Sequence, residues 1–111
     1  MPGSNPNFLN GVPEMLVLKM LSRRPMYGYE LVKAIQEQSQ EHFAFGEGCV
    51  YPVLHYLEQH KRVTRQRRTV GGRDRQYYQL TARGQKQLEE LSGEWGRVVK
   101  AVGLVLGGQH E

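Results

Sequence analysis

The chain has 111 residues, a length typical of one domain with a single modest hydrophobic core. Its 39% apolar content includes no run near the roughly 20 apolar residues that a membrane span needs. The single cysteine cannot form an internal disulfide, and the first residues lack the charged start and apolar stretch of a secretory signal. We therefore expect a cytoplasmic protein that does not span a membrane.

Positive charge is concentrated in one segment. The whole chain has a formal net charge of +4, whereas residues 61–75 contain seven Lys and Arg residues against one Asp, a local charge of +6. The rest of the chain is therefore slightly acidic. Such a local excess is typical of a surface that binds phosphate groups, although a solvated loop would also carry it.

The first predicted helix is almost wholly apolar. Residues 1–7 form a flexible lead-in, and we expect structure to begin near Phe8. Apolar residues then dominate 12–21, which predicts a helix that other elements cover on most sides. Pro13 is acceptable only in the first turn of that helix, and Pro25 ends it.

Two amphipathic helices follow. The first runs from about residue 29 to Gln38, and the second starts near Gly48 or Cys49, which would place Pro52 in its first turn. The second helix has an apolar stripe formed by Val50, Leu54 and Leu57. The residues off this stripe, which are free to contact a partner, are Cys49, Tyr51, His55 and Gln59.

The pattern then changes to that of strands. Residues 63–70 and 76–80 have strand composition and are separated by Gly71-Gly72, which predicts a β-hairpin. We expect a long turn whose tip holds Arg73, Asp74 and Arg75. Three helices followed by a hairpin is the order of a winged helix-turn-helix. The predicted fold is thus mainly α with a small β-hairpin, and residues 8–80 form a DNA-binding domain.

Residues 81–107 predict one long final helix, capped by Thr81 and followed by a tail at 108–111. Its apolar residues recur at spacings of three and four, which is typical of a coiled-coil seam. A domain of this size cannot easily bury such a stripe alone, so we expect a two-fold homodimer. The predicted dimerisation residues are Leu88, Leu91, Trp95, Val98, Val102 and Val105.

Three motifs occur in order: Tyr27-Gly28-Tyr29-Glu30-Leu31, then Gly48-Cys49-Val50-Tyr51-Pro52-Val53-Leu54 with Leu57-Glu58, and Arg75-Gln76-Tyr77-Tyr78-Gln79-Leu80-Thr81-Ala82-Arg83-Gly84. In these motifs the chain resembles the PadR family of bacterial transcriptional regulators, from about residue 9 to 106. With one helix after the wing, it is similar to the short branch of that family, whose members are dimeric repressors relieved by small molecules. The resemblance implies a repressor that binds a palindromic operator in duplex DNA.

Two positions depart from the family pattern. Many relatives have Ser-Pro before the glycine and Thr after it, whereas this chain has Gly46-Glu47 and Cys49 and so lacks the hydroxyls that usually contact phosphate there. The glycine that commonly follows the recognition helix is replaced at His60-Lys61. The turn there is either wider or strained by a positive φ at a residue other than glycine.

The resemblance places Tyr51 on the DNA-facing helix, where its hydroxyl can donate to a phosphate, although a half-buried ring under the wing is the alternative. His55 and Gln59 are weaker candidates for contacts to base edges. Arg73 and Arg75 are the first candidates in the wing. Since strand residues alternate between faces, only some of the other arginines can share that surface. The remaining candidates are Cys49, Arg65 and Arg67.

Trp95 is either a plain core residue of the dimer or, as in the multidrug-responsive relatives, part of a pocket that stacks planar aromatic compounds. The scattered Cys and His residues lack the spacing of a metal site, and nothing in the sequence indicates a cofactor or the residues of an active site. We therefore predict no metal, no cofactor and no enzymatic activity. One alternative function stays open, namely a protein-interaction module that uses the heptad helix without binding DNA.

Overall fold

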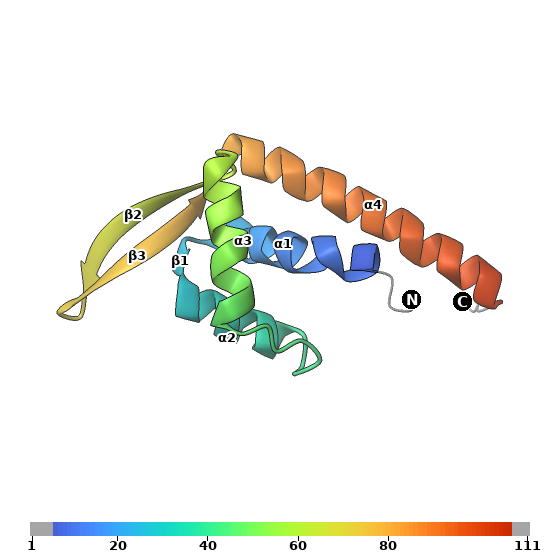
Figure 1. Ribbon diagram of the computed structural model, residues 1–111, viewed down its shortest axis with the longest axis horizontal. Helices are drawn as coiled ribbons and strands as arrows, with labels where there is room; N and C mark the ends of the chain where they lie inside the picture. Colours follow the sequence, from blue (N-terminus) through green and yellow to red (C-terminus); the bar gives the residue numbers. More distant parts are fainter. Residues whose placement is uncertain (1–5, 108–111) are drawn as a thin grey trace.

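The computed structural model describes residues 6–107, with side chains from residue 11 onward. These residues form four helices and a three-stranded antiparallel sheet of order β1-β3-β2 (Figure 1). The elements are α1 (Pro6–Arg23), β1 (Met26–Tyr27), α2 (Gly28–Gln38), α3 (Glu47–Gln59), β2 (Val63–Val70), β3 (Arg73–Leu80) and α4 (Ala82–Leu106). The predicted order of three helices, a hairpin and a long last helix is confirmed.

Helix α1 lies at the centre of the core. It contacts α2, α3, α4 and β3, and its Val17 and Leu18 are fully buried. Contacts on several sides explain why its apolar residues do not form a single stripe. The helices that pack on it contribute Leu31, Ile35, Val50, Leu54, Leu57 and Leu88.

Two prolines lie deeper in their helices than predicted. Helix α1 begins at Pro6, so Pro13 lies well past the first turn. Helix α3 begins at Glu47 after the cap residue Gly46, so Pro52 falls in its second turn. An interior proline costs a helix about 3 kcal/mol because it removes one hydrogen bond. The expected first-turn placements were therefore wrong, because both helices begin earlier than predicted.

The β2–β3 hairpin, which we call the wing, has a shorter turn than predicted. Its register runs from Val63 opposite Leu80 to Val70 opposite Arg73, so the turn consists of Gly71 and Gly72. Their φ angles of 61° and 79° fit a type I′ turn, whose twist matches that of the flanking strands. The prediction of a long turn was wrong, and residues 73–75 belong to β3.

The register also assigns each wing residue to one of two faces, because successive strand residues point in opposite directions. Tyr78 is buried, so its face covers the core. Arg65 pairs with Tyr78, and Arg67 lies two residues further along the same face. The opposite face, which we call the outer face, carries Gln66, Arg68, Arg73, Arg75 and Tyr77.

The junction between α3, the wing and α4 is tightly bonded. Lys61 has a φ of 60°, which confirms the strained alternative predicted for this turn. Thr81 Oγ1 accepts a hydrogen bond from the Gly84 backbone N–H at 3.0 Å and donates to the Lys61 carbonyl at 2.8 Å. Thr81 is thus the predicted N-cap of α4, and its hydroxyl also ties the helix to the strained turn.

Helix α4 leaves the domain as a long arm (Figure 1). Its apolar residues become more exposed along the helix: Leu88 is 5% exposed, Trp95 36%, Val102 48% and Val105 87%. Leu88 therefore belongs to the core of its own chain. The later part of the apolar stripe is exposed in the protomer.

Candidate nucleic-acid interface

The outer side of α3 presents the residues expected to face a partner. His55 and Gln59 are exposed, and Cys49 and Tyr51 are half-buried. They surround the buried stripe of α3, as its helical spacing predicted. Tyr51 also packs against the core cluster, so the structural role considered for this residue is present.

A groove of about 590 Å³ runs between α3, the start of α2 and strand β3. We call it the wing groove, and it brings together four of the predicted DNA-contacting residues, namely Tyr51, His55, Arg73 and Arg75. Its other lining residues are Tyr27, Gly28, Tyr29, Asp74, Gln76 and Tyr78. Phenol, imidazole and guanidinium donors thus converge on one hollow, which suits it to an anionic backbone.

The other predicted contacts lie elsewhere. Cys49 and Gln59 are on α3 outside the lining of the wing groove. Arg65 and Arg67 are on the core-side face of the wing, and Arg65 Nε forms an ion pair with Glu58 Oε2 at 3.3 Å. Arg65 therefore has an intramolecular partner that a phosphate contact would have to replace.

Tyr78 closes the base of the wing groove. Burial raises the pKa of its hydroxyl above the usual value of 10.0, and the positive charge of Arg65 partly offsets that effect. The phenol consequently stays neutral over the whole physiological range. It contributes packing and not charge to this surface.

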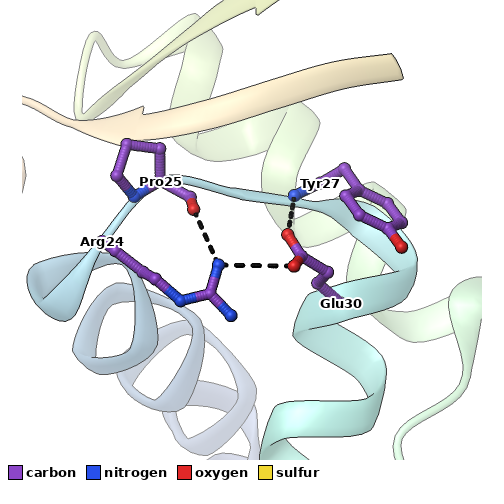
Figure 2. Close-up of polar contacts among 4 residues, drawn as sticks. All are labelled: Arg24, Pro25, Tyr27 and Glu30. Carbon is purple, nitrogen blue, oxygen red and sulfur yellow. Dashed lines mark hydrogen bonds and ion pairs between the residues drawn. The ribbon is translucent and has the colours of Figure 1, made fainter. Parts of the chain in front are cut away.

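The start of α2 holds two tyrosines that the sequence did not single out as contacts. Tyr29 is 50% exposed, and Tyr27 lies in β1 opposite Tyr77. Glu30 fixes this corner: its Oε1 accepts from the Tyr27 backbone N–H at 3.1 Å, and its Oε2 pairs with Arg24 at 3.3 Å (Figure 2). In the sequence, the Tyr-Gly-Tyr motif was the signal for these two tyrosines. The residue opposite Tyr27, Tyr77, lies some 50 residues further along the chain, so the contact could not be read from the motif.

A second hollow, of about 150 Å³, lies between α1 and α4. Trp95, the candidate ligand-binding residue, lies in its wall, and the opposite wall comes from α1. The complete lining is Gly11, Val12, Met15, Leu91, Glu94, Trp95 and Val98. Three of the predicted dimerisation residues thus border a space that the protomer alone does not fill.

Residues 6–107 were expected to contain neither a metal site nor a membrane span. No group of three or more His, Cys, Asp and Glu side chains there is placed to hold a metal ion. No helix in that range is both long and apolar enough to cross a bilayer.

The sequence matches the family described as "Transcriptional regulator PadR-like family" over residues 17–90. It is 35% identical over 83 residues to the transcriptional regulator YqjI of Escherichia coli strain K12. That match covers 75% of this chain but 39% of YqjI, so the chain corresponds to only part of that relative.

Solved structures with the same fold cover nearly all of the chain. A PadR-like transcriptional regulator from Bacillus cereus is 32% identical, with a TM-score of 0.78 over 93% of this chain and 99% of that one. A PadR family regulator from Eggerthella lenta is 29% identical, with a TM-score of 0.78 over 93% of this chain and 88% of that one.

Proposed function

Since this chain belongs to the PadR-like family of transcriptional regulators, which bind DNA and are not enzymes, we propose that it is a ligand-responsive, homodimeric repressor of a palindromic operator. The observation that carries the proposal is the wing groove, where donors from α3 and from the wing converge. The proposed partner is DNA, which fits the cytoplasmic location expected from the sequence.

The proposed binding mode places α3 in the major groove and the wing in the adjacent minor groove. One sugar-phosphate strand separates those two grooves, and the wing groove is the hollow that would receive it. Tyr51 and Tyr29 would donate phenol hydroxyls to its phosphates, while Arg73 and Arg75 contribute charge. His55, exposed on the same side of α3, is the candidate for a base contact.

The proposed dimer forms along α4. The seam, which we define as Leu91, Trp95, Val98, Val102 and Val105, would pair with the same residues of a second chain. Exposed valines and leucines on an otherwise polar helix support this arrangement, because burying them removes apolar area from water at about 25 cal/mol per Å². Leu88 supports the dimer only indirectly, since it already packs in its own core.

The proposed effector is a planar aromatic molecule that stacks on Trp95 in the hollow between α1 and α4. A volume of about 150 Å³ in one protomer is small for such a ligand. The second chain would therefore have to complete the pocket. The effector relieves repression only if its affinity differs between the DNA-competent dimer and another dimer geometry.

The decisive experiment is selection of DNA from a random duplex pool by the purified protein, followed by sequencing. The expected product is an inverted repeat with half-sites about one helical turn apart, bound with strong salt dependence. A protein that stays monomeric at micromolar concentration and ignores duplexes in dilute buffer would contradict the proposal. A dimer that binds no duplex would instead favour the protein-interaction module.

The effector has its own test, because the chain contains a single tryptophan. Titration with planar aromatic cations and phenolic acids should quench or shift the fluorescence of Trp95. Release of labelled operator by the same compounds should follow the same concentration dependence. If no compound of the panel changes the fluorescence, the pocket at Trp95 must be abandoned.

A further inference from the structure

Guanidinium groups and tyrosine rings form a chain of contacts that joins Tyr27, in the body of the protein, to the outer face of the wing. The guanidinium carbon of Arg75 lies 4.1 Å from the centre of the Tyr27 ring. Tyr27 meets Tyr77 edge to face, with ring centres 5.4 Å apart. The guanidinium carbon of Arg68 in turn lies 5.0 Å from the Tyr77 ring centre. We call these four residues the ladder.

The residues of the ladder differ in how firmly they are held. Tyr27 belongs to β1, and the pairing of β1 with β3 places it opposite Tyr77. Its backbone N–H donates to Glu30, which Arg24 holds from the other side (Figure 2). Arg68 and Arg75 face each other across the wing, close to its glycine turn. The ladder therefore connects a fixed corner of the domain with the distal half of the wing.

The distal half of the wing has few other attachments to the domain. Val63 and Tyr78 are buried at its base, but every β2 residue from Thr64 to Val70 is exposed. A side-chain hydrogen bond from Thr69 to Asp74 joins the two strands to each other and not to the domain. A two-stranded hairpin without such anchoring is only marginally ordered in water.

We propose that the ladder holds the wing at a fixed angle to α3, and that Tyr27 is the positioning residue for Arg75. The inference rests on the proposed function, because the angle matters only if the wing contacts DNA. A wing that is already ordered in the free protein loses less conformational freedom on binding, so the ladder raises affinity for DNA. Arg73 shares the outer face but lies beyond the ladder, nearer the turn.

The first test measures motion in the DNA-free protein by NMR relaxation. In the wild type, backbone order parameters of residues 66–75 should be near those of a rigid chain, about 0.85. Tyr27→Leu should lower those of the distal half toward about 0.6, whereas Tyr27→Phe, which keeps the ring, should leave them unchanged. A wing that stays equally rigid in Tyr27→Leu overturns the proposal.

The second test measures affinity for the selected duplex. Tyr27→Leu should weaken binding about fivefold, consistent with loss of a cation–π contact and an aromatic pair, and Tyr27→Phe, which removes only the hydroxyl at the groove, should weaken it much less. In an Arg75→Gln background the same change should cost clearly less than fivefold, because the contact with Arg75 is already gone and only the aromatic pair with Tyr77 is left to lose. In an Arg73→Gln background, the matched control, the fivefold cost should persist. Equal costs in both backgrounds overturn the role of Tyr27 in positioning Arg75.

Arg75→Gln covers the case in which Tyr27→Leu does not fold. It keeps the β1 pairing but removes the cation that lies over the Tyr27 ring. Order parameters of the distal wing should fall, and a rigid wing in this variant again overturns the ladder. If the wild type binds no duplex but the wing loosens as expected, the ladder stands and the proposed function fails.

Discussion

The ring of Tyr51 lies directly on the backbone of Gly28. A Cβ atom at residue 28 would lie 2.6 Å from Tyr51 Cε1 and closer still to the hydroxyl oxygen, so only glycine fits. This contact joins the first turn of α2 to the outer side of α3. It also sets the position of the phenol at the edge of the wing groove.

We expect Gly28→Ala to destabilise the protein by about 1–3 kcal/mol, because the added methyl group must displace the Tyr51 ring. Urea unfolding should show a lower midpoint with an unchanged slope. Gly48→Ala is the matched control, since nothing lies within 4 Å of a Cβ there and the helix should gain up to about 1 kcal/mol. A Gly28→Ala protein as stable as wild type would show that the contact does not restrict this position.

Arg73→Gln should weaken operator binding and make it less sensitive to salt. Loss of one phosphate contact lowers the slope of log K against log salt by about 0.9. Fluorescence anisotropy of labelled duplex at several salt concentrations measures this slope. Arg67→Gln removes the same charge from the opposite face of the wing and should change the slope much less. Equal slopes for the two variants would contradict the proposed role of Arg73, which lines the wing groove, as opposed to Arg67, which does not.

Val102→Glu should give a folded monomer. Val102 is 48% exposed in the protomer, so a carboxylate there is tolerated until two seams meet. Like charges brought together in an interface cost several kcal/mol, and dimerisation should weaken by roughly 100-fold or more. Analytical ultracentrifugation gives the association constant. Lys100→Glu, an exposed position off the seam, should leave it nearly unchanged, and a fully dimeric Val102→Glu protein would exclude this seam.

The stability of the fold should fall in alkaline solution because of Tyr78. Its folded pKa is raised by burial, so the unfolded chain loses this proton first as the pH passes about 10. The contribution of Tyr78 to the free energy of unfolding is therefore constant below the unfolded pKa and declines as the pH rises from the unfolded pKa towards the folded pKa. Tyr78→Phe should show a shallower decline above pH 10 in urea titrations. An identical decline in both proteins would assign the effect to other groups.

The helices and the hairpin could be predicted because their signals are local. The apolar stripe of Val50, Leu54 and Leu57 and the Thr81 cap follow from spacing or from the residue type at one position. The strain at Lys61 was one of two alternatives, and the comparison with the family pattern raised it. The interior placement of Pro13 and Pro52 could not be predicted in this way. It depends on how much each helix gains from neighbours that are distant in sequence.

The candidate site was only partly predictable for a related reason. Residues 73–75 have the composition of a loop, and only pairing with residues 68–70 makes them a strand. The same register places Arg73 and Arg75 on one face of the wing and Arg65 and Arg67 on the other. Composition alone does not distinguish these four arginines. Tyr27 escaped notice because the groups that it touches, Arg75 and Tyr77, are brought to it by the fold.

Helix α4 starts directly behind the wing, at Ala82, and its other end carries the proposed seam. Its 25 residues span about 37 Å at 1.5 Å per residue. Trp95 lies 13 residues from Ala82, about 20 Å along this helix. With the helix as a lever, a tilt of about 10° at Trp95 displaces the wing by about 3.4 Å, the spacing of one base-pair step. A ligand at Trp95 would then need only a modest change of helix crossing to put two half-sites out of step.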